Sequence, residues 1–277
     1  MPSSIEVSVG DLSALVGSGA APVIVDVRTD DDFALEPRLV PASRRRDWHD
    51  VSAWAPHYSC ARPVVVICQK GLKLSHGVAA WLRQQGVPAK SLMGGFEAWR
   101  AAGGLTVSTA HSLPRDQAGR SLWVTRSRPK VDRIACPWLI RRFVDEQAVF
   151  LFVAASEVAA VADRFGATPF DIDGVFWSHR GELCSFDTMI QELGLVSPAL
   201  DRLAAIVRGA DTARPDLAPQ AAGLLAVSLG LSRLHGDDLR QLDAAMGLYD
   251  ALYIWSRDAA DESHNWPSSA AAAVRMA

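Results

Sequence analysis

The stretch Pro63-Val64-Val65-Val66-Ile67-Cys68-Gln69-Lys70-Gly71-Leu72-Lys73-Leu74-Ser75 sets the fold of the first third of the chain. It begins with a short run of β-branched apolar residues, which is typical of a buried strand. Similar runs occur at residues 22–27 and 91–93, and helical patterns follow at residues 75–85 and 96–101. This alternation predicts an α/β domain, a parallel sheet with flanking helices.

Cys68 lies between this strand and the next predicted helix, where a loop can direct several backbone N–H groups at one point. The start of the helix adds partial positive charge, and two lysines add more. Such a loop holds a tetrahedral anion or stabilises a thiolate. The alternative is a small buried apolar residue at a strand end. We predict Cys68 as the catalytic residue. The predicted anion-binding loop consists of Gln69, Lys70, Gly71, Leu72, Lys73, Leu74 and Ser75.

The composition is that of a folded globular protein long enough for two domains. The chain has 277 residues and a formal net charge of −3, which gives no general attraction to nucleic acids or anionic membranes. The sequence has no signal peptide, and no apolar stretch reaches the roughly 20 residues of a membrane span. Four separated cysteines favour reduced thiols. We therefore expect a cytoplasmic protein whose partners include neither a membrane nor a nucleic acid.

The rest of the chain predicts a second domain, mostly helical and of the α+β class. Scattered glycines and prolines indicate a linker at residues 106–120, between domains at residues 1–105 and 121–257. The tail, residues 258–277, is predicted to be flexible. Strands are predicted at residues 122–125, 149–153 and 175–177. Helices are predicted at residues 137–144, 157–165, 185–193, 198–208, 218–231 and 238–255.

Three segments of the first domain resemble the signatures of the rhodanese superfamily. They are Asp26-Val27-Arg28 followed by Asp32-Phe33, Cys68-x-x-Gly71, and Gly94-Gly95-Phe96-x-x-Trp99. The resemblance covers residues 5–104. It implies that Cys68 takes up a sulfane sulfur as a persulfide and passes it to a nucleophile, as a thiosulfate sulfurtransferase does.

One departure from the rhodanese pattern concerns the length of the loop. Ser75 stands seven residues after Cys68, one more than in the family, so the loop is predicted to be one residue longer. In relatives a longer loop is associated with phosphate or arsenate, which leaves a tetrahedral oxyanion open as the ligand. Cys60 is interpreted as an inert loop cysteine, with a resolving thiol as the alternative.

Residues with metal-binding side chains gather in the segment His179-Arg180-Gly181-Glu182-Leu183-Cys184-Ser185-Phe186-Asp187. Imidazole, carboxylate and thiolate together suit zinc, iron or manganese. The alternative is a polar turn with Cys184 in the core, in which Asp187 caps the next helix. We predict a divalent metal site of His179, Glu182, Cys184 and Asp211, with Asp132 as a further candidate ligand.

Arginines of the second domain are candidates for oxyanion binding, because a guanidinium group matches the geometry of a tetrahedral anion. We predict this role for Arg133, Arg141 and Arg208. The alternative is that these arginines form salt bridges within the protein.

The second domain also resembles the chromate-resistance protein family, whose domain forms the C-terminal part of ChrB-type chromate regulators. The resemblance covers residues 121–257 and implies chromate resistance or a response to chromate. Besides the segment at residues 179–187, it rests on Lys130-Val131-Asp132-Arg133-Ile134-Ala135-Cys136-Pro137-Trp138-Leu139-Ile140-Arg141-Arg142-Phe143 and Ile206-Val207-Arg208-Gly209-Ala210-Asp211.

The two resemblances together predict a protein of chromate or sulfur-stress defence. Cys68 would act on a small sulfur donor or a tetrahedral oxyanion, and the second domain would bind a metal ion or an oxyanion. The alternative is a non-catalytic sensor of chromate, another oxyanion or redox state that acts as a regulator. Net acidity and the lack of a recognisable helix-turn-helix argue against direct DNA binding.

Overall fold

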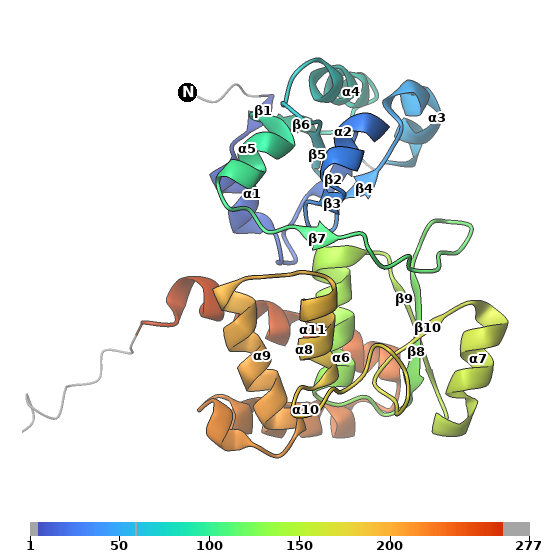
Figure 1. Ribbon diagram of the computed structural model, residues 1–277, viewed down its shortest axis with the longest axis vertical. Coiled ribbons are helices and arrows are strands. Elements are labelled where there is room, and N and C mark those ends of the chain that lie inside the picture. The colour runs from blue at the N-terminus through green and yellow to red at the C-terminus, as the bar shows by residue number, and fades with distance from the viewer. Residues whose placement is uncertain (1–4, 59, 263–277) are drawn as a thin grey trace, which may run out of the picture.

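The computed structural model describes residues 5–58 and 60–262, which form two lobes stacked on each other (Figure 1). Among these residues, the first lobe contains a five-stranded parallel sheet in the order β1-β6-β5-β2-β4. Its strands are β1 (Glu6–Val7), β2 (Val23–Asp26), β4 (Arg44–Arg45), β5 (Val64–Ile67) and β6 (Ala89–Leu92). The helices of this lobe are α1 (Val9–Leu15), α2 (Asp30–Leu35), α3 (Val51–Trp54), α4 (Lys73–Gln84) and α5 (Gly95–Ala101). The predicted α/β class is confirmed.

The centre of the first sheet is β5, and all four of its residues are buried. Alternate side chains of a strand point to opposite faces, so β5 contributes to two apolar clusters. Val65 and Ile67 belong to one cluster, and Val64 and Val66 belong to the other, together with side chains of α4. An apolar strand with both faces covered is the pattern expected of a parallel sheet.

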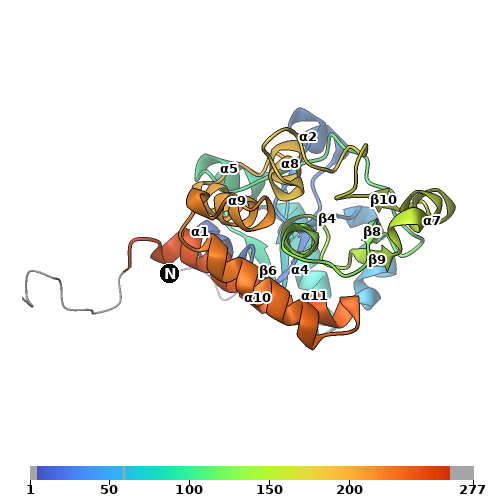
Figure 2. The same cartoon turned by 90° about the horizontal axis from the view of Figure 1, so that it is seen from below.

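The second lobe is mostly helical around a small parallel sheet in the order β10-β8-β9. Its strands are β8 (Leu122–Arg126), β9 (Val149–Val153) and β10 (Thr168–Pro169). Its helices are α6 (Asp132–Leu139), α7 (Val158–Phe165), α8 (Ser185–Glu192), α9 (Pro198–Asp211), α10 (Ala221–Leu234) and α11 (Asp238–Ile254). Helix α6 contacts α8, α9 and α11 at the centre, and Figure 2 shows α10 and α11 running across the lower face. The mostly helical character predicted for this half is confirmed.

The segment predicted as a linker is packed between the lobes. Its first residues form β7 (Val107–Ser108), which pairs antiparallel with β3 (Arg38–Leu39) of the first lobe. The backbone N–H of Ser108 also donates to the carbonyl of Leu193 in the second lobe, at 2.8 Å. Figure 1 shows β7 at the boundary. The segment therefore joins the lobes instead of spacing them apart.

The two lobes share one apolar core. Leu12, Val40 and Phe96 of the first lobe belong to the same buried cluster as Trp138 and Phe143 of the second. Polar contacts cross the boundary as well. They include the hydrogen bond from the Ala42 N–H to the Phe143 carbonyl (2.6 Å), the ion pair of Arg44 with Asp145 (2.6 Å), and the hydrogen bonds from Arg257 to the carbonyls of Ser13, Ala14 and Val16.

Two further predictions can be compared with the described residues. The strand predicted at residues 175–177 is wrong: Val175 and Phe176 lie in a bend, and Trp177 makes a single bridge to Phe170. Of the predicted flexible tail, residues 258–262 are described, and Asp258 lies in the π-helical segment Trp255–Ala259. Residues 263–277 lie outside the described part. No described helix has both the length and the apolar character needed to cross a membrane.

Candidate functional site

Cys68 directly follows β5 at the carboxyl edge of the first sheet, and its exposed fraction is 4%. Helix α4 begins at Lys73, two residues before its predicted start. Ser75 therefore lies in the first turn of α4, and the connection between strand and helix is Cys68 to Leu72. Of the predicted anion-binding loop, Lys73, Leu74 and Ser75 are therefore helical, and the extra residue relative to the family's loop stays a prediction.

Three glycines hold the loop against the start of α5. Gly71, Gly94 and Gly95 all have positive φ angles, a region that glycine enters without steric cost. A Cβ on Gly95 would collide with the Cys68 carbonyl oxygen and the Gly71 nitrogen. The carbonyl of Cys68 also accepts a hydrogen bond from the Phe96 N–H, at 3.0 Å. The Gly94-Gly95-Phe96 motif thus fixes the backbone that carries Cys68.

The loop offers hydrogen-bond donors for an anion. In the described chain, no protein acceptor takes a hydrogen bond from the backbone N–H groups of residues 69–74. The Cys68 thiol donates to the Ser75 hydroxyl oxygen at 3.2 Å. Lys70 and Lys73 are exposed beside the loop and add positive charge. This arrangement can hold a thiolate, a persulfide or a small anion next to Cys68.

The first signature has a structural role. Arg28 is buried, and its guanidinium group binds Asp26 in two hydrogen bonds of 2.9 and 2.6 Å while lying 3.7 Å from the centre of the Phe96 ring. The same group donates to the carbonyl oxygens of Glu36 and Arg38. A bidentate pair with its remaining donors satisfied is a stable way to bury a charge. The signature therefore connects β2 to the segment after α2.

Cys60 is far from Cys68. Its sulfur lies 4.0 Å from the carbonyl oxygen of Gln85, just past the C-terminal end of α4, whereas Cys68 lies at the N-terminal end of that helix. The helix has 12 residues and is therefore about 18 Å long. A disulfide requires Cα atoms within about 7 Å. Cys60 does not serve as a resolving thiol for Cys68 in this conformation.

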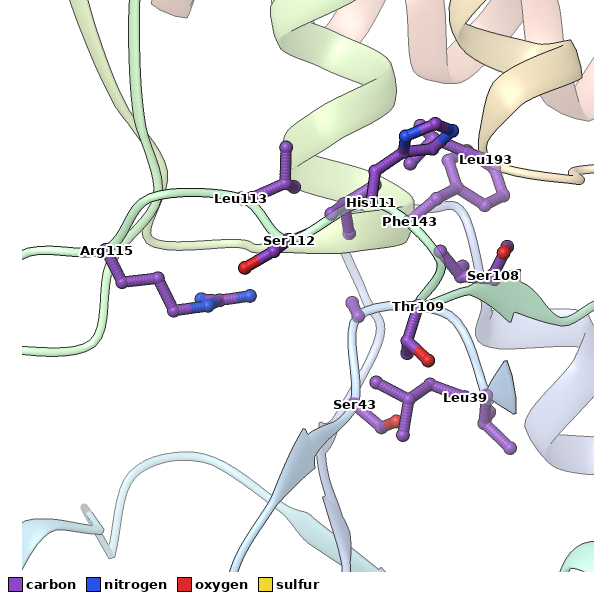
Figure 3. Close-up of a pocket in the computed structure, with 14 residues that line it drawn as sticks. Leu39, Ser43, Ser108, Thr109, His111, Ser112, Leu113, Arg115, Phe143 and Leu193 are labelled. Atoms are coloured by element: carbon purple, nitrogen blue, oxygen red, sulfur yellow. The ribbon is translucent and has the colours of Figure 1, made fainter. Parts of the chain in front are cut away.

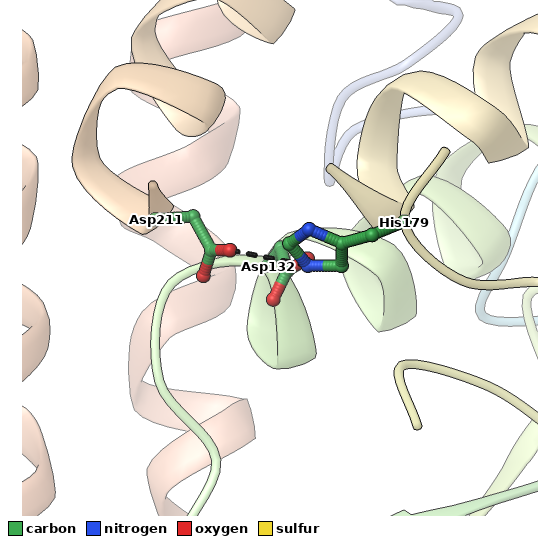
Figure 4. A group of neighbouring side chains, drawn as sticks. All are labelled: Asp132, His179 and Asp211. Atoms are coloured by element: carbon green, nitrogen blue, oxygen red, sulfur yellow. Dashed lines mark ion pairs between the residues drawn. The ribbon is translucent and has the colours of Figure 1, made fainter. Parts of the chain in front are cut away.

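A second cluster of chemically active side chains lies in the second lobe (Figure 4). The Nε2 atom of His179 is 3.3 Å from Asp132, 3.3 Å from Asp171 and 3.4 Å from Asp211, measured to the nearest carboxylate oxygen. Ligand atoms of Asp132, His179 and Asp211 all lie within 4.8 Å of one another. Asp132 begins α6, which follows β8, and Asp171 follows β10, so the cluster sits at the carboxyl edge of a parallel sheet, a common place for a binding site.

The carboxylates strongly affect proton binding in this cluster. Hydrogen bonds to Asp132, Asp171 and Asp211 raise the pKa of His179 to about 12, which makes the imidazole a cation at neutral pH. Burial, together with the charges of Asp171 and Asp211, raises the pKa of Asp132 to about 7 against the opposing effect of the hydrogen bond with His179. Strong perturbation of several neighbouring groups is typical of functional sites.

Only two of the four ligands predicted from the sequence lie in this cluster. His179 and Asp211 meet there, and Asp132, a further candidate, joins them. Glu182 is exposed and lies outside the group. Cys184 is buried, and its thiol donates to Asp187 at 3.2 Å. Burial raises the pKa of the Cys184 thiol well above its usual range, and its sulfur is not among the ligand atoms that gather around His179.

Asp187 has the alternative role that the sequence suggested. Its carboxylate accepts the N–H of Cys184 at 3.0 Å and so caps the start of α8. The capped helix begins beside the cluster, and the Ser185 hydroxyl donates to Asp171 at 2.7 Å.

The three arginines predicted to bind an oxyanion each have a carboxylate partner. Arg133 pairs with Asp171 at 3.1 Å, Arg141 with Asp243 at 2.9 Å, and Arg208 with Asp187 at 2.6 Å. The structure therefore favours the alternative of internal salt bridges, and it does not bring the three guanidinium groups together.

Sequence reasoning missed two features. Asp171 follows β10, a strand of two residues that contains a proline, so no strand pattern pointed to the carboxylate at its end. The other is a cavity of about 330 Å³ at the boundary of the lobes, lined by side chains of both lobes and of the packed linker (Figure 3). The buried Ser43 hydroxyl and Arg115 line it, and within the described residues this hydroxyl has no hydrogen-bond partner. The pattern of scattered glycines and prolines gave no signal for a cavity.

Comparisons with known proteins agree with this division into two parts. The rhodanese-like domain family matches residues 8–102, and the ChrB C-terminal domain family matches residues 123–256. Protein ChrB of Cupriavidus metallidurans is 37% identical over 142 residues, which are 50% of this chain and 42% of that protein. This chain therefore spans less than half the length of that relative.

The first third matches smaller enzymes and rhodanese structures. The thiosulfate sulfurtransferase GlpE of Ectopseudomonas mendocina is 39% identical over 80 residues, covering 28% of this chain and 71% of that enzyme. The solved structure of a rhodanese homologue from Thermus thermophilus is 31% identical and covers 34% of this chain and 98% of that one, with a TM-score of 0.28. The chain belongs to the rhodanese-like family through its first third and carries a ChrB C-terminal domain in its second half.

Proposed function

We propose that this protein is a sulfurtransferase of chromate or sulfur-stress defence, with Cys68 as the sulfur carrier. The observation that supports this most directly is the position of Cys68, at the end of the central strand and beside a loop of backbone N–H groups without protein acceptors. The identity of 39% to a thiosulfate sulfurtransferase supports the type of reaction.

The reaction has two steps. The Cys68 thiolate attacks the outer sulfur of a thiosulfate-like donor, a sulfur–sulfur bond forms, and sulfite leaves with the electron pair of the broken bond. A nucleophile then attacks the outer sulfur of the persulfide and releases the Cys68 thiolate. The N–H groups of the loop stabilise the negative charge of the persulfide, and Lys70 and Lys73 attract the anionic donor.

The link to chromate comes from the second half of the chain. The ChrB C-terminal domain and the identity of 37% to Protein ChrB support a role in chromate defence. The rival function is a non-catalytic sensor, in which Cys68 binds an oxyanion without transferring sulfur.

A thiosulfate:cyanide assay of the whole chain tests this proposal. The wild type should produce thiocyanate, and Cys68→Ser should reduce the rate to background while circular dichroism shows an intact fold. Cys60→Ser is the matched control and should keep full activity, because Cys60 lies at the other end of α4. An inactive wild type would favour the sensor, and an active Cys68→Ser variant would remove Cys68 from the mechanism.

A further inference from the structure

The cluster around His179 contains more hydrogen-bond acceptors than its protons can satisfy. Oxygens of Asp132, Asp171 and Asp211 all lie within 3.4 Å of the same Nε2 atom. An imidazole nitrogen carries at most one proton, and that proton points in one direction. At least two of these three carboxylates therefore do not accept a well-directed hydrogen bond from Nε2.

The carboxylates differ in how their charge is balanced. Asp171 accepts hydrogen bonds or ion pairs from Arg133 at 3.1 Å and from the Ser185 hydroxyl at 2.7 Å. Asp132 is 1% exposed and accepts the Ser185 N–H at 3.2 Å. In the described part of the chain, neither Asp132 nor Asp211 forms an ion pair with an arginine or a lysine. Burying an ionised carboxylate costs several kcal/mol, and within the described residues His179 is the one basic side chain paired with Asp132 and Asp211, so a bound metal ion would lower that cost.

The positions of the ligands on the chain also favour an ion over a set of salt bridges. Asp132 is the first residue of α6, His179 precedes α8, and Asp211 is the last residue of α9. These three elements contact one another, so the backbones that carry the ligands are held in place by core packing. Three ligand atoms within 4.8 Å of one another can surround a single ion after small side-chain rotations.

We propose that Asp132, His179 and Asp211 bind one divalent first-row metal ion. The donor set is two carboxylate oxygens and the imidazole nitrogen of His179, which releases its proton to solvent when the ion binds; this set suits manganese, iron(II) or zinc. Cys184 and Cys136 are fully buried and do not contribute a thiolate.

Such a site keeps coordination positions open. Three protein ligands leave room for water or a substrate oxygen, the arrangement found in catalytic metal sites. The His179 side chain is 41% exposed and that of Asp211 is 18% exposed, so an ion reaches the site from solvent. Asp171 lies beside the site, where the Ser185 hydroxyl and Arg133 hold its carboxylate and balance its charge. The site does not depend on sulfur transfer at Cys68, so either proposal can fail alone.

Titration of the chelator-treated, dialysed full-length protein with MnCl₂, ZnCl₂ or anaerobic FeCl₂ tests the site. Isothermal calorimetry should detect one ion per chain, with a Kd tighter than about 100 µM for at least one metal. The bound Mn²⁺ should also lose its aqueous electron paramagnetic resonance signal. His179→Ala and Asp211→Asn should weaken binding at least about tenfold, the low end of the effect expected for altered metal sites.

Glu182→Gln is the matched control, because Glu182 is an exposed carboxylate three residues from His179 and outside the cluster. It should bind the metal as the wild type does. We choose Asp211→Asn over a variant of Asp132 because Asp211 is more exposed, so its substitution is less able to disturb folding. Circular dichroism checks the fold of every variant. The proposal is overturned if the wild type binds none of the three metals, if folded His179→Ala and Asp211→Asn bind normally, or if Glu182→Gln loses binding equally.

Discussion

The Cys68 loop and the His179 cluster occupy equivalent places in two different sheets. Each lies at the carboxyl edge of parallel strands, Cys68 after β5 and the carboxylates of Asp132 and Asp171 after β8 and β10. The Cys68 site is built mostly from one continuous loop. The His179 cluster draws its four side chains from segments separated by between 8 and 39 positions along the chain, from Asp132 to Asp211.

This difference determines how each site responds to a mutation or to a bound ligand. A site on one continuous loop loses its geometry when a substitution forces that loop's backbone into another conformation. A cluster assembled from distant segments depends on the packing of the elements that carry them, and a ligand that joins those segments stabilises the folded state.

Gly95→Ala should have the largest effect, because it blocks the backbone path of the Cys68 loop. The new Cβ would collide with backbone atoms of Cys68, Gln69 and Gly71, and none of these is a flexible side chain. Sulfur transfer should fall at least about 100-fold, the scale expected when a reacting group moves by about 1 Å. The rate of thiocyanate formation measures the effect.

Gly103→Ala separates this collision from backbone strain. Gly103 also has a positive φ, of 72°, but a Cβ there meets no atom within 4 Å. Its variant should lose about 1 kcal/mol of stability from strain and keep its activity. Equal activity of the two variants would show that Gly94-Gly95 does not shape the site.

The Cys68 site was largely predictable because its determinants are local. A β-branched run, a cysteine and a glycine–lysine loop stand side by side in the sequence, and the paired glycines 26 and 27 residues later complete the signature. The error concerned the start of α4. The sequence pattern predicts a helix that starts at Ser75, whereas α4 starts at Lys73 and Ser75 contacts Cys68 from its first turn.

The His179 cluster was only partly predictable, since its members meet through tertiary packing. Spacing drew attention to Glu182 and Cys184, near His179 in sequence, but one points to solvent and the other into the core. Asp211, predicted from the sequence as a ligand together with His179, does lie 3.4 Å from the Nε2 atom of His179. No strand pattern in the sequence pointed to Asp171, because β10, the strand before it, has only two residues. The chain also turns sharply at Asp171, where φ is 50°.

Metal addition should stabilise the protein by joining the segments of the cluster. At a free metal concentration 100 times the Kd, the free energy of unfolding should rise by about 2.7 kcal/mol. Thermal melts with metal and with chelator measure this difference. Cys68→Ser should show the same stabilisation, whereas Asp211→Asn should lose it. If neither metal nor chelator changes the melting temperature of the wild type, the metal site is contradicted and the cluster is only a set of hydrogen-bonded polar side chains.

Asp145→Asn should weaken the boundary between the lobes and so affect both sites together. Asp145 is 1% exposed and accepts hydrogen bonds from Ser121 and, across the boundary, from Arg44. Loss of its charge should lower the free energy of unfolding by about 2 kcal/mol. Chemical denaturation, followed by a spectroscopic signal from each lobe, measures this change in the free energy of unfolding. Asp116→Asn, in the packed linker, removes only a more exposed ion pair with Arg120 and is the control; it should change stability by less than about 1 kcal/mol.

The effect of Asp145 also has a defined pH dependence. Burial alone would raise its pKa, but hydrogen bonds from Ser121 and Arg44 outweigh burial and hold the pKa below its ordinary value of 3.8. Its contribution is therefore complete above pH 3.8 and disappears as the pH falls through the lower folded-state value. The stability difference between wild type and Asp145→Asn should shrink in that range. A difference that stays constant down to the acid transition would contradict this account.

Lys73→Gln should have the smallest effect, because it removes an exposed charge and leaves the backbone of the Cys68 loop in place. Lys73 is the first residue of α4, beside the loop N–H groups, so its charge attracts an anionic donor without contacting the core. The KM for thiosulfate should rise about two- to fivefold at low salt, with kcat unchanged, since exposed charges contribute less than about 1 kcal/mol. The difference should fade as added NaCl screens the charge. Lys90→Gln, on β6 and equally exposed, has the same charge change away from the loop and should keep the wild-type KM. A fall in kcat without a change in KM would instead give Lys73 a part in the chemical step, and the Cys68 site would then depend on side chains as much as on its backbone.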